Sequence, residues 1–272
     1  MDRRHFIGRA VSSGALAMIA PTAASQSAQA SRVRERVGTV EASLAPAIHV
    51  AGEPHPGRWT LVERMALYRV PGVSIAVIKD RQIDWAKGYG VLDGNFTAPV
   101  TPETLFQAAS ISKSVTAVAA LRLVEQGKLV LDDPVNASLK SWKVPENEFT
   151  REAPVTLRQL LSHSAGITAN NSGYYSPSKP MPTIVQLLDG APPSGGRPVR
   201  VETKPGERWR YSNNGYAIVQ VLLEDVTGKP FGQLMKELVL APAGMNLSRF
   251  QQPLALAARA EAAAAHRRAA GT

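Results

Sequence analysis

Two side chains capable of acyl-transfer chemistry, Ser110 and Lys113, stand three residues apart in the segment FQAASISKSVTAVAAL. If this segment is helical, both side chains lie on one face, with about 5–6 Å between their Cβ atoms. The lysine amine can then take the serine hydroxyl proton, provided that burial keeps the amine uncharged. The N–H of Ser110 would be a first-turn donor that can face a developing oxyanion. A serine that only caps the helix is the alternative, and the local sequence leaves both interpretations open.

The same spacing occurs a second time, at Ser176 and Lys179. Pro177 and Pro180 disfavour a regular helix in that segment. We therefore assign no chemistry to the second pair.

A second motif, Tyr211-Ser212-Asn213, follows the segment KPGERWR at the predicted entry to a helix. A tyrosine beside a lysine ammonium can have a lowered pKa and act as a base or proton relay. The Asn213 amide can hold a substrate carbonyl and the lysine together. Two alternatives remain open: residues 212–214 only cap the helix, or Ser212 is the serine of an overlapping Ser-x-Asn motif.

The elements that must position these residues indicate a mixed α and β domain. Apolar, β-branched runs at 73–79 and 83–91 predict a hairpin turning at Asp80-Arg81, although a tight turn usually has glycine in place of Arg81. Residues 112–126 predict a helix that is buried on most sides and ended by Gly127.

The remaining segments predict helices and one long loop. Helices are predicted at 156–162, 216–226 and 231–240. Residues 172–205 hold seven prolines and predict a long loop. The polar stretch 31–60 is expected to be irregular or helical, and the Ala-rich residues 254–272 to form a solvated helix or a frayed end.

Composition excludes several classes of protein. The 272 residues are 44% hydrophobic and 19% charged, which is typical of a globular chain of one large domain or two modest ones. The absence of cysteine excludes a disulfide framework, a thiolate zinc site and a cysteine nucleophile. No apolar run approaches the roughly 20 residues that span a bilayer, so stable membrane insertion is not expected. The net charge of +9 is scattered, without a basic run or basic-aromatic stripe, so nucleic acid is not an expected partner.

Residues 1–30 predict a removable export signal of the twin-arginine type. Arg3-Arg4 precedes Phe6-Ile7, a mildly apolar stretch follows at 11–20, and a small-x-small site lies at 28–30. The mature protein is then expected to begin near Ser31 and to be periplasmic or secreted. An Arg-rich N-terminus of a cytosolic protein is the alternative.

Several ordered segments make the chain similar to the serine β-lactamase and penicillin-binding-protein superfamily. They cover most of residues 72–246 and include GVSIAVIKDRQIDWAKGYGVLD, LVLDDPV, TLRQLLSHSAGI, PGERWRYSNNGYAIVQVLLEDVTGKPF and LAPAGM. The chain most resembles the branch that contains class C β-lactamases, D-Ala-D-Ala carboxypeptidases and related esterases. That resemblance implies an α+β fold, in which a β-lactamase/transpeptidase-like antiparallel sheet is flanked by helices and accompanied by a helical subdomain.

The resemblance also implies roles for individual residues. Ser110 would be the acylated nucleophile, Lys113 its proton partner, Tyr211 the general base or relay, and Asn213 the residue that positions substrate. For His163, in LLSHSAG, it implies a structural role, and a lone histidine in a tight turn is more often a hydrogen-bonded fastener than a catalyst. No cofactor and no metal are implied.

One feature of the resembled family is missing from this sequence. The family has a Lys-x-Gly or His-x-Gly strand after Tyr-x-Asn, which supplies a second oxyanion donor, but no lysine or histidine after Asn213 has glycine two residues on. The two letter matches, His55-Pro56-Gly57 and Lys204-Pro205-Gly206, precede Tyr211 and place proline where a strand needs an N–H. We therefore expect residues 31–272 to form a partial, C-terminally truncated hydrolase domain that lacks the C-terminal sheet strands.

These observations predict an exported serine hydrolase that forms an acyl-enzyme on Ser110. Its expected substrates are a β-lactam, a D-Ala-D-Ala-type peptide or an ester, and the missing strand is expected to impair activity. The alternative is a non-catalytic remnant or a module that binds cell-wall ligands. The expected partner is a small-molecule or cell-wall peptide substrate, and the oligomeric state is left open.

Overall fold

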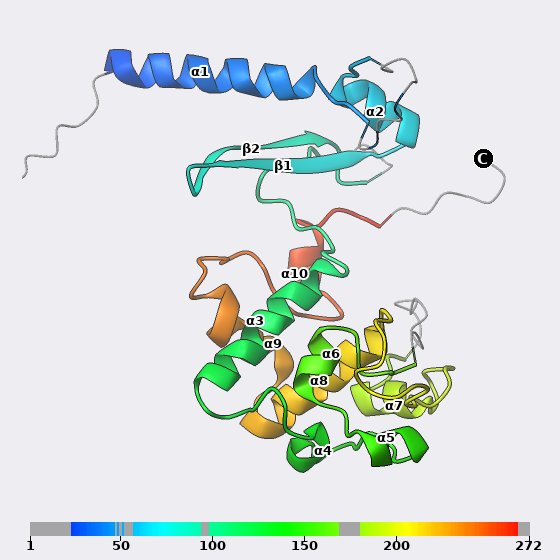
Figure 1. The fold of residues 1–272 in the computed structure, drawn as a ribbon. Helices are drawn as coiled ribbons and strands as arrows, with labels where there is room; N and C mark the ends of the chain where they lie inside the picture. The colour runs from blue at the N-terminus through cyan, green and yellow to red at the C-terminus, as the bar shows by residue number, and fades with distance from the viewer. Residues whose placement is uncertain are drawn as a thin grey trace, which may run out of the picture. The chain divides into compact units, whose positions relative to one another are not determined.

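The computed structural model describes residues 23–46, 48, 51, 57–93, 98–168 and 180–265. These residues fall into two compact units, at 1–102 and 103–272 (Figure 1). Most of the predicted export signal, the second Ser-x-x-Lys pair and His55-Pro56 lie outside the described residues.

The first unit contains two helices and a two-stranded sheet. Its elements are α1 (Ala23–Glu41), α2 (Leu61–Tyr68), β1 (Gly72–Lys79) and β2 (Gln82–Gly90). Helix α1 runs through the small-x-small site at 28–30 and lies along β2 (Figure 1). Two ion pairs join them: Arg36 donates to both carboxylate oxygens of Asp84 at 2.8 and 2.6 Å, and Lys87 contacts Glu41 at 2.6 Å. The predicted helical character therefore holds for the first part of the stretch 31–60.

The antiparallel hairpin predicted at 73–91 is confirmed. Strands β1 and β2 pair from Gly72 opposite Gly90 to Lys79 opposite Gln82, with a register irregularity near the tip. The two residues between the strands, Asp80 and Arg81, have φ values of 52° and 62°. Positive φ at both central residues is the type I′ geometry, whose twist matches that of the flanking strands. The chain adopts this turn although Arg81 carries a Cβ that disfavours it.

We expect Arg81→Gly to stabilise the hairpin by about 0.5–1 kcal/mol, because glycine adopts positive φ without the steric cost of a Cβ. Amide hydrogen exchange of β1 and β2 measures the effect, and 1 kcal/mol corresponds to about fivefold slower exchange. The matched control, Gln82→Gly, places glycine in extended strand and should speed exchange instead. Equal effects of the two glycines would contradict the strain at residue 81.

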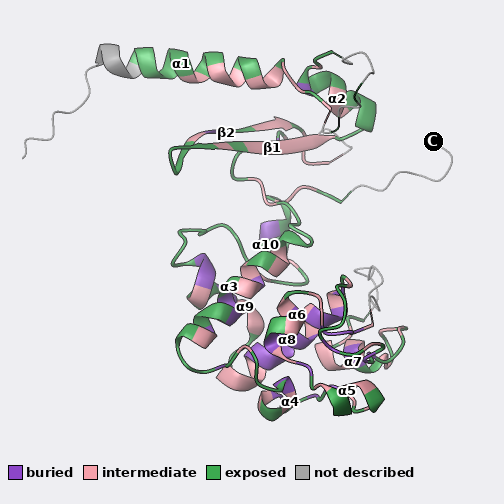
Figure 2. Cartoon of the chain, viewed as in Figure 1, coloured by how far each residue is buried: buried purple, intermediate pink, exposed green. Residues whose placement is uncertain are grey.

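The second unit is helical and packs around α8. Its elements are α3 (Ile111–Glu125), α4 (Val135–Ser138), α5 (Glu148–Glu152), α6 (Leu157–Leu161), α7 (Ile184–Asp189), α8 (Asn213–Thr227), α9 (Phe231–Met235), the π-helical turn η1 (Lys236–Leu240) and α10 (Leu256–Arg259). Figure 2 shows the buried residues of this unit concentrated on α8 and on the helix faces around it. The most completely buried side chains of α8 are Ile218, Val219, Val221, Leu222 and Leu223.

The helices predicted at 156–162, 216–226 and 231–240 are confirmed, as α6, α8, and α9 with η1. Helix α8 begins three residues before the predicted start, because Ser212 caps it. In the Ala-rich tail, the described residues form α10 and a short parallel bridge between Ala262 and Leu105.

The prediction that the helix at 112–126 is buried on most sides is wrong. The helix itself is present as α3 and is followed by Gly127 at φ 69°. Only one face of it is buried, whereas Ile111, Val118 and Leu121 are 70%, 46% and 47% exposed. A nearly uniform apolar composition carries no periodicity, so it does not indicate how many faces are covered.

The prediction of a long loop at 172–205 is also wrong in its described part, which contains α7. Thr183 and Gln186 form a reciprocal capping box, with bonds of 3.1 and 2.9 Å, and Gly190 ends the helix at φ 65°. The prolines at 180, 182, 192 and 193 flank this helix and do not interrupt it. The overlooked signal was the Thr-x-x-Gln pattern, which predicts a helix start.

Candidate active site

Ser110 stands at the start of α3 without capping it. Its φ and ψ of −72° and −10° are helical, and its side chain makes no cap hydrogen bond. Instead, its Oγ lies 2.7 Å from the Tyr211 hydroxyl and accepts a hydrogen bond from Lys113 Nζ at 3.1 Å. The interpretation of Ser110 as a simple helix cap is therefore wrong.

The backbone turn before α3 presents the Ser110 side chain. Ala109 has φ 45°, a left-handed conformation that costs a residue with a Cβ about 1–2 kcal/mol. Two backbone hydrogen bonds, each 3.1 Å long, close the turn. The Ile111 N–H donates to the Ala108 carbonyl, and the Ser112 N–H donates to the Ala109 carbonyl. Backbone strain of this kind recurs at functional sites, where the surrounding structure maintains it.

Lys113 lies in the first turn of α3 and is half-buried between aromatic rings. Its Nζ is 4.9 Å from the ring centroid of Tyr211 and 5.9 Å from that of Tyr216. Both rings are within range to stabilise an ammonium group through cation–π attraction. This contact favours the charged form of Lys113, so it does not supply the burial that would keep the amine uncharged.

Tyr211 reaches this group from a segment 101 residues further along the chain. Hydrogen bonding to Lys113, and then to Ser110, lowers the pKa of the Tyr211 phenol below its ordinary value of 10.0. The side chain is 36% exposed, so the site remains open to solvent on one side. A phenol in this environment ionises more readily than a free tyrosine, and its phenolate form is the one that can accept the Ser110 proton.

Ser212 caps α8 and takes no part in the Ser110 cluster. Its Oγ accepts from the Gly215 N–H at 3.1 Å and donates to the Thr168 carbonyl at 2.9 Å. Asn214 donates to the same carbonyl at 2.9 Å. The capping alternative is thus correct for Ser212, while the alternative of a reactive Ser212 in a Ser-x-Asn motif is wrong because its hydroxyl is buried and engaged.

Asn213 is the first residue of α8 and is half-buried, two residues after Tyr211. The capped start of the helix fixes its backbone next to that of Tyr211. A role for its amide in positioning substrate stays a prediction.

His163 lies in the turn that follows α6 and contacts the segment that carries Tyr211. Its Nδ1 accepts from the Ser212 N–H at 3.2 Å, and its carbonyl accepts from the Arg210 N–H at 2.8 Å. The prediction of a hydrogen-bonded fastener is confirmed. Burial, and then the charge of Lys113, lowers the pKa of the His163 imidazole below 6.5.

Tyr216, which belongs to none of the motifs read from the sequence, completes the aromatic surroundings of Lys113. Its hydroxyl donates to the Leu161 carbonyl at 3.1 Å, and burial raises the pKa of its phenol. The available signal was its position three residues after Asn213, which places both on one face of α8.

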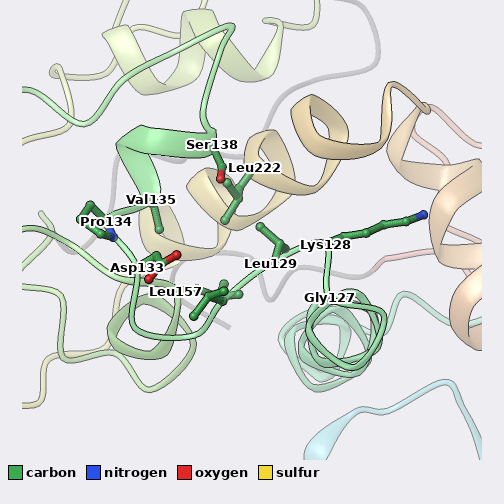
Figure 3. Close-up of a pocket in the computed structure, with 10 residues that line it drawn as sticks. Gly127, Lys128, Leu129, Asp133, Pro134, Val135, Ser138, Leu157 and Leu222 are labelled. Carbon is green, nitrogen blue, oxygen red and sulfur yellow. The ribbon is translucent and has the colours of Figure 1, made fainter.

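Other features of the described residues lie away from this cluster. Figure 3 shows a small pocket in the second unit to which Lys128, Asp133, Ser138, Leu157 and Leu222 contribute, and its lining includes none of the predicted site residues. Within the described ranges, histidine, aspartate and glutamate side chains form no group of three that could hold a metal ion. No helix in those ranges has the length and apolar character needed to cross a bilayer.

Comparison with known proteins yields one family match and several relatives. The profile of the family described as Beta-lactamase matches residues 60–271. Protein flp of Staphylococcus aureus strain MW2 is 26% identical over 186 residues, which cover 67% of this chain and 35% of flp. The chain therefore spans about a third of the length of this curated relative.

The solved structures that this chain resembles include penicillin-binding proteins and beta-lactamases. The octameric penicillin-binding protein homologue from Pyrococcus abyssi is 36% identical, with a TM-score of 0.56, over 68% of this chain and 42% of that one. A beta-lactamase/D-alanine carboxypeptidase from Yersinia pestis is 26% identical, with a TM-score of 0.52, over 67% of this chain and 51% of that one. The expected β-lactamase/transpeptidase-like fold is confirmed by these matches.

Proposed function

The chain belongs to the beta-lactamase family, and we propose that within this family it is an exported serine hydrolase that forms an acyl-enzyme on Ser110. The observation that carries this proposal is the position of Ser110 Oγ, which lies within hydrogen-bonding distance of both the Tyr211 hydroxyl and Lys113 Nζ. Export rests on the twin-arginine-type pattern within residues 1–30.

In the proposed acylation step, Ser110 Oγ bonds to the substrate carbonyl carbon. Its proton passes to the oxygen of the Tyr211 phenolate, 2.7 Å away. Lys113 favours this transfer, because a cation beside the phenol stabilises the phenolate. The N–H of Ser110, at the N-cap of α3, is the proposed donor to the developing oxyanion.

Collapse of the tetrahedral intermediate breaks the carbonyl bond to the leaving amine or alcohol, which takes the proton held by Tyr211. Water then attacks the acyl ester and loses a proton to the same phenolate. As the bond between the acyl carbon and Ser110 Oγ breaks, Tyr211 returns that proton to Oγ, and the carboxylic acid product leaves. Each step therefore uses Tyr211 once as a base and once as an acid, and the balance closes without a cofactor.

We propose a β-lactam, a D-alanyl peptide or an ester as substrate, since each offers a carbonyl with a leaving amine or alcohol. The name of the Yersinia pestis relative supports the first two. Turnover by the 272-residue chain is proposed to be slow, because it has no Lys-x-Gly or His-x-Gly after Asn213. The loss of a single oxyanion donor costs about 2.7–4 kcal/mol in transition-state stabilisation.

The proposal is tested by incubating the chain with a fluorophosphonate or benzylpenicillin and locating the adduct by mass spectrometry. We expect one adduct, on Ser110, that is lost in Ser110→Ala. Two controls should keep it: Ser114→Ala, which changes an exposed serine of α3, and Ser176→Ala, in the second Ser-x-x-Lys. The absence of any adduct on folded protein, or its persistence in Ser110→Ala, would reject the proposal. Penicillin binding without an adduct would favour the non-catalytic alternative.

A further inference from the structure

We infer that His163 is a positioning residue that holds the Tyr211 phenol over Ser110, and that it does so only while its imidazole is uncharged. The inference rests on the proposed roles of Ser110 and Tyr211. It assigns the pH dependence of the site to a residue that takes no part in the proposed proton transfers.

The first observation is that His163 binds the chain on both sides of Tyr211. The residue before Tyr211, Arg210, donates its N–H to the His163 carbonyl at 2.8 Å. The residue after it, Ser212, donates its N–H to His163 Nδ1 at 3.2 Å. One residue of the α6 turn thereby fixes the direction in which the Tyr211 side chain leaves the backbone.

The second observation is that the imidazole also supports the phenol ring itself. The ring centroids of His163 and Tyr211 are 4.5 Å apart, with the planes inclined at 40°. Tyr216 packs on the imidazole at 5.3 Å, and the Trp209 ring meets it edge-on at 6.2 Å. The imidazole, which is half-buried, therefore contacts three aromatic rings, and these contacts restrain its rotation away from Ser212.

The bond from Ser212 determines the protonation state of the ring. Nδ1 can accept an N–H only if it carries no hydrogen, so the imidazole must be the neutral tautomer with its proton on Nε2. Protonation of Nδ1 would place two N–H donors opposite each other and abolish the hydrogen bond. The imidazole would then no longer fix the backbone of Ser212, the residue after Tyr211.

The positive charge that faces His163 also favours its neutral form. Lys113 of α3 faces it as a cation, and Tyr211 and Tyr216 face it as phenols. The Arg210 guanidinium is engaged with Glu202 and with the Ile167 carbonyl. Burial and Lys113 place the pKa of His163 below 6.5, so the bond is fully present above pH 6.5. It weakens as pH falls from 6.5 through the lower pKa of the folded state.

Two substitutions of His163 distinguish the effect of its hydrogen bond to Ser212 from the effect of its aromatic ring. His163 has φ 60°, which asparagine tolerates better than most residues. The Oδ1 of His163→Asn can accept from Ser212 in place of Nδ1 and does not titrate, whereas His163→Phe keeps a ring and loses the acceptor. We expect His163→Phe to slow fluorophosphonate labelling of Ser110 by about 10–100-fold, since a misplacement of 1 Å can cost about 100-fold. His163→Asn should recover most of that loss.

The pH profile of labelling distinguishes positioning from a merely structural role. In the parent chain, the labelling rate should fall below pH 6.5 with an ionisation that His163→Asn lacks. A profile that His163→Asn leaves unchanged would overturn the inference.

A measurement that does not depend on acylation of Ser110 tests this inference independently of the proposed function. Tyrosine labelled with ¹³C at Cζ reports the Tyr211 phenol by NMR, with Tyr211→Phe assigning the signal. We expect this signal to shift with the midpoint of the His163 titration, and the shift to vanish in His163→Asn. A Tyr211 signal that ignores the His163 titration overturns the inference even if Ser110 is acylated. A coupled signal without any adduct on Ser110 rejects only the proposed function.

Discussion

We expect Lys113→Met to reduce the rate of Ser110 acylation by about 10²–10⁴-fold, the range that general-base catalysis contributes, because the Tyr211 phenolate loses the cation that stabilises it. Methionine keeps a long, unbranched side chain between the Tyr211 and Tyr216 rings, but it removes the donor to Ser110 Oγ and the positive charge. Fluorophosphonate labelling followed over time by intact-protein mass spectrometry gives the rate.

The same substitution should raise the pKa of the Tyr211 phenol towards 10.0, because hydrogen bonding to Lys113 is the largest cause of its lowering. It should also raise the pKa of His163, whose imidazole loses a neighbouring cation. Lys128→Met is the matched control, since Lys128 lies just beyond α3 and outside the Ser110 cluster. Equal labelling rates for the parent chain and Lys113→Met would remove Lys113 from the mechanism.

We expect Leu223→Ala to lower the free energy of unfolding of the second unit by about 2–5 kcal/mol, the range for a leucine truncated in a packed core. Leu223 is 0% exposed on α8, the helix around which this unit packs. Urea unfolding followed by circular dichroism, with hydrogen exchange of the α8 amides, measures the loss.

The control for this substitution is Leu121→Ala, in a leucine of α3 that is 47% exposed. It should cost roughly 0.5 kcal/mol or little more, as surface substitutions do. Similar losses in the two variants would contradict the central position of α8. Since Tyr211 immediately precedes the Ser212 cap, a loosened α8 should also slow labelling of Ser110.

Local signals predicted much of the fold correctly. The β-branched runs at 73–79 and 83–91 predicted the hairpin and the position of its turn, because β-propensity acts within a strand. Gly127 and Gly228 marked helix ends, because each follows its helix with φ near 70°. The two errors, the burial of α3 and the loop at 172–205, arose where uniform composition or proline density obscured the local pattern.

The candidate site contains one contact between residues close in the sequence and two between residues far apart in it. Ser110 and Lys113 meet because helical geometry brings residues three apart onto one face, and the sequence alone determined that pairing. The contact of Ser110 with Tyr211 joins positions 101 residues apart. The bond between His163 and Ser212 spans 49 residues. Only the packing of α3, the α6 turn and the start of α8 in one unit decided these two contacts, because no local rule relates segments so distant along the chain.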